Sequence, residues 1–245
     1  MARIDVHAEI GTTPLWGVAF SDANLARSMQ KFGVEKCIVS STIANSCDFK
    51  LGNAQIARVV KANPNMLGCA VVNINYPEQS QQEMHTYLSD DSFAGILVTS
   101  GMRERCVTLA ESEEILNGHR RFVKPVFLRA TDQCSLHAAN EMAKAFPIMK
   151  FVLLGMGDED WRMATVLAER TLNLVLEVSG SFSPDKIKFA VEHIGSHRMV
   201  YGSSLPYVDP SAIIGLIEDA DISDADKRNI FENSAKRLFA NKPAK

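Results

Sequence analysis

An alternation of short apolar segments with longer amphipathic segments runs through this chain from end to end. The strand-like segments are residues 3–8, 34–42, 67–74, 93–99, 124–130, 149–154, 172–178 and 198–202. Each is followed by a stretch whose apolar residues recur at helical spacing, and the strand–helix period is about 25 to 35 residues. Largely apolar strands that alternate with helices are typical of a parallel sheet covered by helices.

Eight strand–helix units in 245 residues predict a (β/α)8 barrel, or TIM barrel. We expect a single domain over residues 1–240, with residues 241–245 as a C-terminal tail. The alternative is a doubly wound open sheet, which usually has about five or six strands. The absence of Gly-x-Gly-x-x-Gly after the first strand favours the barrel. In a barrel the carboxyl ends of all strands meet at one end, where active sites of this fold lie.

The composition argues against several classes of partner. The net charge is -3 and the basic residues are scattered, so neither nucleic acid nor an acidic membrane is expected to bind. No apolar run approaches the roughly 20 residues of a membrane span, and because the chain enters a strand-like run at once we expect no signal peptide. The five cysteines, an odd number without metal-ligand spacing, predict reduced thiols in a cytoplasmic protein.

Four strand regions and the last helix resemble those of one known family. The segments are Ile4-Asp-Val-His7, Phe151-Val-Leu-Leu-Gly-Met-Gly157, Leu172-Asn-Leu-Val-Leu-Glu-Val-Ser179, His197-Arg-Met-Val-Tyr-Gly-Ser-Ser-Leu-Pro206 and Ile230-Phe-Glu-Asn-Ser-Ala-Lys-Arg-Leu-Phe239. Together they resemble the amidohydrolase-related (amidohydrolase 2-type) group of the amidohydrolase superfamily. The resemblance spans nearly the whole chain and implies a TIM barrel of hydrolase ancestry.

The resemblance also implies one or two divalent metal ions, usually zinc, at the carboxyl ends of the strands. The family's usual ligands are His-x-His on the first strand, histidines on the fifth and sixth, and an Asp on the eighth. His7 keeps the first of these positions, but Glu9, Arg129, Gly155 and Ser204 stand at the others. Arginine cannot ligate a metal and its charge opposes a dication, so we expect a degenerate site without the catalytic metal.

Two interpretations of Arg129 follow from its place on the fifth strand. The guanidinium either pairs with Glu9 and fills the vacated metal site, or holds a ligand carboxylate or phosphate in bidentate fashion. Some relatives that hydrolyse lactones of aromatic breakdown resemble the second case, because they use arginines and no metal. His7 is the candidate acid and base, or else a histidine satisfied by a hydrogen bond. Glu9 orients His7, acts as an acid or base itself, or neutralises Arg129.

Further candidate substrate-binding residues lie in the loops that follow the strands. Ser203 and Ser204 donate hydrogen bonds to a ligand or form local caps. Glu177, at the end of the seventh strand, is expected to face the site and pair with Arg129. Trp16 roofs the pocket or packs under its loop, and Arg103 lines an anion site or belongs to a solvated charge run.

Three functions remain open at this point. The first is a metal-independent hydrolase or lactonase that acts on a small carboxylated molecule, with His7 as acid and base and Arg129 as anion clamp. The second is a catalytically silent barrel that binds a small molecule or serves as a partner subunit. The third is a divalent-metal hydrolase or decarboxylase that uses His7 and Glu9. The expected partners are a small anionic ligand and, by default for this fold, a second copy in a homodimer.

Overall fold

The computed structural model describes residues 2–12, 17–102 and 105–240 of the chain. Two of the predicted site residues, Trp16 and Arg103, lie outside these ranges, as does the predicted tail of residues 241–245.

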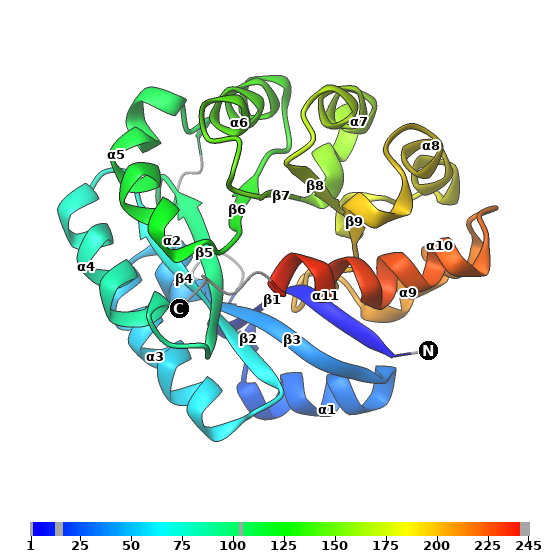
Figure 1. Ribbon diagram of the computed structural model, residues 1–245. Coiled ribbons are helices and arrows are strands. Elements are labelled where there is room, and N and C mark those ends of the chain that lie inside the picture. The colour runs from blue at the N-terminus through cyan, green and yellow to red at the C-terminus, as the bar shows by residue number, and fades with distance from the viewer. Residues whose placement is uncertain (1, 13–16, 103–104, 241–245) are drawn as a thin grey trace.

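A curled, mostly parallel sheet of nine strands forms the centre of the α/β fold (Figure 1). Its strands are β1 (Arg3–Thr12), β2 (Ala19–Phe20), β3 (Val34–Ser41), β4 (Met66–Asn73), β5 (Phe93–Thr99), β6 (Val126–Arg129), β7 (Phe151–Leu154), β8 (Leu174–Glu177) and β9 (Met199–Val200). The order is β2-β1-β3-β4-β5-β6-β7-β8-β9, and every pair is parallel except the antiparallel β1–β2. All eight predicted strands are therefore present in order, whereas β2 was not predicted.

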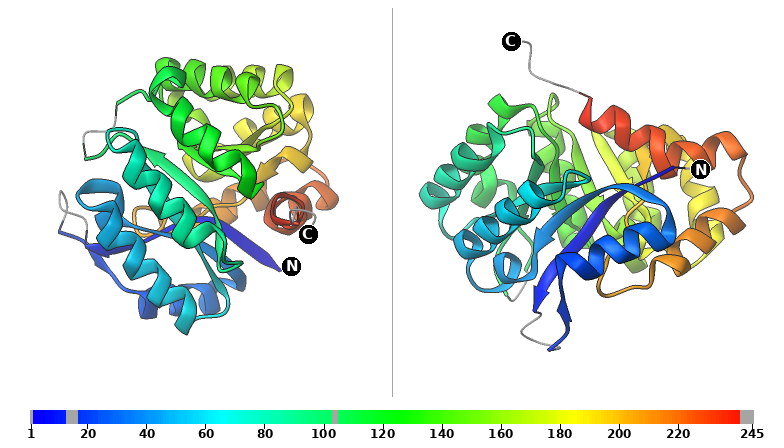
Figure 2. Two further views of the ribbon diagram at one scale, coloured as in Figure 1. Left: turned by 60° about the vertical axis from the view of Figure 1, so that its left-hand side comes forward. Right: turned by 90° about the horizontal axis from the view of Figure 1, so that it is seen from below.

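Helices surround the outer side of the curled sheet (Figures 1 and 2). They are α1 (Asp22–Phe32), α2 (Thr42–Ser46), α3 (Phe49–Ala62), α4 (Pro77–Leu88), α5 (Leu109–His119), α6 (Gln133–Ala145), α7 (Trp161–Arg170), α8 (Pro184–Ile194), α9 (Pro210–Asp219), α10 (Asp224–Arg228) and α11 (Ser234–Phe239). Local signals set many of their starts: Ser21 and Asp48 accept hydrogen bonds from the first turns of α1 and α3, and a proline opens α4.

Short turns of other helical types join some of these elements. They comprise 3-10 turns at Arg120–Phe122, Gly155–Asp160, Val178–Gly180 and Ser196–Arg198, and a π turn at Asn229–Asn233 that links α10 to α11. None of the described helices is both long and apolar enough to cross a membrane. All five cysteines carry free thiols.

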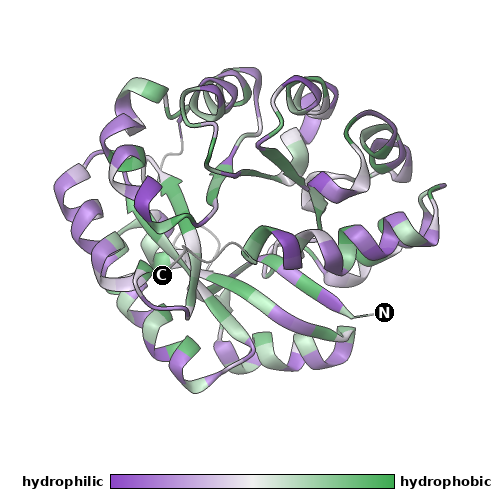
Figure 3. Cartoon of the chain, in the orientation of Figure 1, coloured by the Kyte–Doolittle hydropathy of each residue, from purple (hydrophilic) through white to green (hydrophobic). Residues whose placement is uncertain are grey.

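Apolar residues pack in two layers, one on each face of the sheet, and Figure 3 shows the hydrophobic strands beside helices that turn polar residues outward. The outer layer lies between strands and helices and includes Val39, Val72 and Ile96. The inner layer includes Ile38, Val71 and Leu97, one residue away on the same strands, as the two-residue period of a strand requires. Ala235 and Leu238 of α11 complete the inner layer, so α11 covers the end of the sheet where the strands begin.

One irregularity in β1 reverses which of its side chains face inward. Ile4 and Val6 belong to the inner layer, but Ala8 and Ile10 belong to the outer layer. Between them the pairing with β3 shifts, because Asp5 is opposite Cys37 and Ala8 is opposite Val39. Three residue steps on β1 thus match two on β3, which is the signature of a β-bulge. Beyond the bulge, His7 and Glu9 take the inner side.

The Asp5 carboxylate holds this bulge in place. Its Oδ1 accepts hydrogen bonds from the backbone N–H of His7 at 3.0 Å and of Ser203 at 2.9 Å. Asp5 is only 2% exposed, and this burial raises its pKa from 3.8 to about 6, against the opposing effect of its hydrogen bonds. The same side chain therefore satisfies a backbone group that the bulge removes from the sheet and ties β1 to the segment after β9.

The two ends of the parallel sheet are also joined directly. The backbone N–H of Val6 donates to Tyr201 O at 3.0 Å, and that of Glu9 donates to Leu205 O at 2.7 Å. The backbone N–H of Ser204 donates to His7 O at 2.8 Å, beside a parallel bridge between Ala8 and Leu205. These bonds bring β1 and the segment after β9 side by side. The His7 side chain of β1 then lies against Glu177 at the end of β8.

Substitution of Asp5 tests its part in the fold. Asp5→Ala leaves two buried N–H groups without an acceptor and should lower the free energy of unfolding by about 2–4 kcal/mol. Asp5→Asn keeps a carbonyl oxygen at the same place and should cost less. Urea unfolding of the wild type and both variants at one pH measures the difference, and equal stability of the two variants would contradict this account of the bulge.

The raised pKa of Asp5 also predicts a pH dependence. The folded protein binds this proton more tightly than the unfolded chain does, so the resulting stability is present below pH 3.8 and is lost as the pH rises through about 6. Asp5→Asn does not titrate. The stability of the wild type relative to Asp5→Asn should therefore fall by about 1–2 kcal/mol between about pH 5 and pH 8 in urea unfolding experiments.

Candidate functional site

Charged side chains from three strands meet on the inner side of the sheet, at the end where the strands finish. His7 and Glu9 come from β1 after the bulge, whereas Arg129 and Glu177 are the last residues of β6 and β8. Arg129 and Glu177 follow the inward-facing Phe127 and Val175 at the strand period, whereas His7 and Glu9 reach the same side through the bulge. The carboxyl ends of the strands therefore present the guanidinium of Arg129, the titratable imidazole of His7 and two carboxylates.

Glu177 binds His7, whereas the sequence predicted that it would pair with Arg129. Its Oε2 lies 3.0 Å from His7 Nδ1 and accepts hydrogen bonds from Gly155 N at 3.0 Å and Ser179 Oγ at 2.8 Å. Its Oε1 accepts the backbone N–H of Ser179 at 2.6 Å. The prediction was wrong because the bulge places His7 against β8 and because Glu9 already engages Arg129.

The Glu177 contact fixes the state of the His7 ring. The glutamate side chain is fully buried, and an ionised carboxylate only accepts hydrogen bonds, so Nδ1 of His7 carries the proton of this contact. In the neutral imidazole the other nitrogen, Nε2, then holds the lone pair. The His7 side chain is 11% exposed, which leaves part of the ring accessible from the strand-end side. The arrangement is that of an imidazole oriented for proton transfer.

Arg129 and Glu9 form a second pair across the same inner surface. The Arg129 guanidinium donates through Nη2 to Glu9 Oε1, and Tyr207 Oη donates to Glu9 Oε2 at 3.1 Å. The Glu9 side chain is 1% exposed and that of Arg129 is 24% exposed. The structure thus contains the contact required by the first interpretation of Arg129, in which the guanidinium fills the place of a metal.

The two serines after β9 serve the backbone in this arrangement. Ser203 is fully buried, and its hydroxyl donates to His7 O at 3.4 Å and accepts from Leu205 N at 3.2 Å. Ser204 has a positive φ of 55° and binds His7 through its own N–H. Both serines therefore hold the loop against β1. The sequence had left two roles open for them, a local structural role and ligand binding, and these contacts are of the first kind.

Three residues of this surface were not predicted from the sequence. Asp5 holds the bulge, Ser179 contacts Glu177 and lies 3.4 Å from His7 Nδ1, and Tyr207 binds Glu9. Each stood beside a residue that had been identified: Asp5 and Ser179 lie two positions from His7 and Glu177, and Tyr207 follows Pro206. Ser179 lies in the 3-10 turn after β8, and a serine two residues beyond a glutamate at a strand end is a local signal for such a hydrogen bond.

These residues do not fit the divalent metal that the family resemblance implies. Among the described residues there is no group of three His, Cys, Asp or Glu side chains placed to hold a metal ion. Glu9 is engaged on both oxygens by Arg129 and Tyr207, and His7 is engaged by Glu177. The fixed charge of the Arg129 guanidinium beside Glu9 would also oppose a dication.

Comparison with known proteins identifies relatives of the chain. The sequence model of one protein family, described as Amidohydrolase, matches residues 40–240. No curated protein sequence matches the chain.

Solved structures share its fold. One is a 2,6-dihydroxybenzoate decarboxylase from Rhizobium, with a TM-score of 0.80 and 15% identity over 98% of this chain and 99% of that chain. A dihydroxybenzoic acid decarboxylase from Polaromonas sp. JS666, with bound manganese and the inhibitor 2-nitroresorcinol, has a TM-score of 0.80 and 17% identity over 98% and 97%. A 4-oxalomesaconate hydratase from Rhodopseudomonas palustris has a TM-score of 0.72 and 16% identity over 97% and 95%.

A substitution at Gly202 tests how tightly the His7–Glu177 pair is held. A Cβ at this position would lie 2.4 Å from Glu177 Oε1 and 2.8 Å from His7 Cβ, so Gly202→Ala should displace the pair and cost about 1–3 kcal/mol of stability. Gly215 in α9 is the matched control, because a Cβ there meets nothing within 4 Å. Gly215→Ala should raise stability by up to about 1 kcal/mol. Thermal unfolding of both variants measures this contrast, and a Gly202→Ala protein as stable as Gly215→Ala would show a loosely held pair.

Proposed function

The chain belongs to the amidohydrolase family, and from that premise we propose that it hydrolyses a small carboxylated molecule, such as a lactone, without a metal ion. His7 is the acid and base of this reaction. The observation that carries the proposal is the contact between His7 Nδ1 and the buried Glu177 carboxylate at 3.0 Å. Such a contact sets the tautomer of an imidazole and stabilises the imidazolium that forms when it accepts a proton.

The proposed reaction moves one proton through His7. Nε2 accepts a proton from water while the water oxygen attacks the carbonyl carbon of the ester bond, and Glu177 stabilises the imidazolium. As the tetrahedral intermediate collapses, the C–O bond breaks and Nε2 returns the proton to the leaving oxygen. The products are a carboxylic acid and a hydroxyl group, and His7 returns to its starting state.

Arg129 is the proposed contact for the substrate carboxylate. Its side chain is 24% exposed while Glu9 is buried beneath it, so the guanidinium is the part of this pair that a ligand meets. A guanidinium binds carboxylates in defined geometry, but the charge of Glu9 offsets part of the attraction. We therefore expect modest affinity for the substrate.

Metal independence is proposed from the donor set. Glu9, Arg129 and Tyr207 form a closed polar group where the resemblance implies metal ligands. The manganese of the Polaromonas structural neighbour represents the competing case, a metal-dependent decarboxylase.

We also infer that the curled sheet is a closed (β/α)8 barrel, since backbone hydrogen bonds join β1 to the segment after β9.

A second candidate function is a barrel that binds a small anion without catalysis. The Arg129–Glu9 pair favours it, because a guanidinium engaged by a carboxylate of the same chain already has a stabilising partner. Turnover and binding experiments distinguish the two candidates.

Turnover assays test the hydrolase directly. A panel of carboxylated lactones is incubated with the protein in chelator and in added Mn²⁺, beside the dihydroxybenzoates named for the structural neighbours. We expect lactone opening that chelator does not change, with a loss of about 10²–10⁴-fold in His7→Asn. Glu177→Gln should retain the hydrogen bond but lose much of the stabilisation of the imidazolium. Activity that needs Mn²⁺, or decarboxylation in its place, would contradict the proposal.

Ligand-induced thermal shifts test the binding function. Mono- and dicarboxylates should raise the unfolding temperature of the wild type, and Arg129→Lys should weaken the effect because lysine keeps the charge but not the planar fork. Glu9→Gln is the matched variant: it removes the opposing charge beside Arg129 and should strengthen anion binding. Shifts without turnover of any panel substrate would support the silent barrel, and shifts that are unchanged in both variants would place the ligand elsewhere.

A further inference from the structure

A hollow of about 520 Å³ lies at the opposite end of the sheet from His7. Its lining residues precede a strand, lie early in β8 or belong to α11: Lys150, Leu172, Val175, His197, Arg198, Ser234, Arg237 and Leu238. We propose that this hollow is a second ligand site, which binds a small organic phosphate through its basic side chains and an apolar group of the same molecule through its floor.

The side chains that line the hollow give it a positive charge. Lys150, His197, Arg198 and Arg237 line it, and no acidic side chain does within the part of the chain that the structure describes. Arg198 donates through Nε and Nη1 to the backbone oxygens of Ile194 and Ala168, which are neutral. Arg237 donates through Nη2 to Ser234 Oγ at 3.0 Å, also a neutral partner.

The pKa of His197 reflects the positive charge of its neighbours in the hollow. Burial lowers the pKa of His197, and the nearby charges of Arg198 and Arg237 lower it further. The opposing charge in the surroundings is that of Glu169, which acts on Arg198. The three fixed cations, Lys150, Arg198 and Arg237, match a phosphate dianion better than a single carboxylate, because each added negative charge is attracted by all three.

An apolar floor gives the hollow its second property. Leu172 is 71% exposed, and Val175 and Leu238 line the hollow beside it. An exposed leucine beside a cluster of cations is suited to a ligand that joins an anion to an apolar group. The volume is within the range of small-molecule sites, which is about 300–1,000 Å³.

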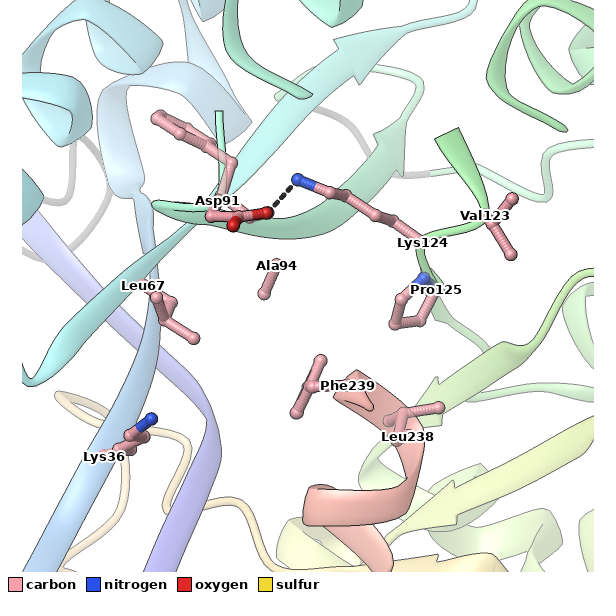
Figure 4. Close-up of a pocket in the computed structure, with 10 residues that line it drawn as sticks. Lys36, Leu67, Asp91, Ala94, Val123, Lys124, Pro125, Leu238 and Phe239 are labelled. Carbon is pink, nitrogen blue, oxygen red and sulfur yellow. Dashed lines mark hydrogen bonds between the residues drawn. The ribbon is translucent and has the colours of Figure 1, made fainter. Parts of the chain in front are cut away.

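The hollow on the other side of α11 provides an internal contrast (Figure 4). It shares Leu238 and has two lysines, Lys36 and Lys124, but its volume is about 270 Å³ and Asp91 lines it. Lys124 Nζ donates to the backbone oxygens of Asp90 at 2.8 Å and Phe93 at 2.6 Å. The carboxylates of Asp91 and Asp90 oppose the charge of Lys124, whereas no acidic side chain among the described residues lines the hollow beside Arg237.

Binding of phenyl phosphate tests the proposal. Titration calorimetry should show saturable binding to the wild type that is weaker for inorganic phosphate and absent for benzyl alcohol. Arg237→Gln and Lys150→Gln should each weaken it by about tenfold or more, as expected for loss of a hydrogen bond to a charged group. Lys236→Gln is the charge-matched control, because Lys236 is next in the chain but pairs with Glu232, and it should leave binding unchanged.

The ring resonances of His197 locate the ligand. They should move on titration with phenyl phosphate in the wild type and much less in Arg237→Gln, while those of His7 stay in place. Thermal unfolding confirms that each variant is folded, which the exposure of Arg237 and Lys150 leads us to expect. The proposal is overturned by the absence of saturable binding, by equal losses in Lys236→Gln and Arg237→Gln, or by a response confined to His7. The site is independent of the proposed hydrolysis, so either can fail alone.

Discussion

The hydrogen bonds accepted by the buried Asp5 carboxylate are the interaction on which the rest of the structure depends. They stabilise a bulge in β1 and attach that strand to the segment after β9. Because a strand alternates its side chains with a period of two, one extra residue turns His7 and Glu9 to the inner face. The position of the candidate site therefore depends on Asp5, whose carboxylate binds the backbone N–H of His7 and not the His7 ring.

The charges at the strand ends divide into two local pairs. Glu177 binds His7, and Glu9 binds Arg129 with help from Tyr207. Burying a carboxylate is costly unless a cation or several hydrogen bonds accompany it. Glu9 has the Arg129 cation and a hydrogen bond from Tyr207, and Glu177 accepts several hydrogen bonds. The same pairing engages both His7 and Glu9 with other side chains of this surface.

Much of the fold could be predicted from the sequence because its signals are local. The alternation of apolar segments with amphipathic ones predicted eight parallel strands in order, and Pro77 and Ser223 marked helix starts that the structure confirms. The site was predicted only in part. His7, Glu9, Arg129 and Glu177 do meet at the strand ends, but the expected Glu177–Arg129 pair does not form, and Tyr207 and Ser179 were missed. Strand β2 was missed because its two residues carry no periodic signal.

The sequence by itself determined the number and order of the parallel strands, the helices between them and the family to which the chain belongs, since periodicity, capping and motifs are properties of neighbouring residues. Only the tertiary structure decided which charged residue faces which. That choice depends on the register between strands far apart in the chain, and here one bulged residue in β1 changed it. The tertiary structure also decided that His7 binds Glu177 and that Tyr207 binds Glu9. It likewise formed the basic hollow beside α11.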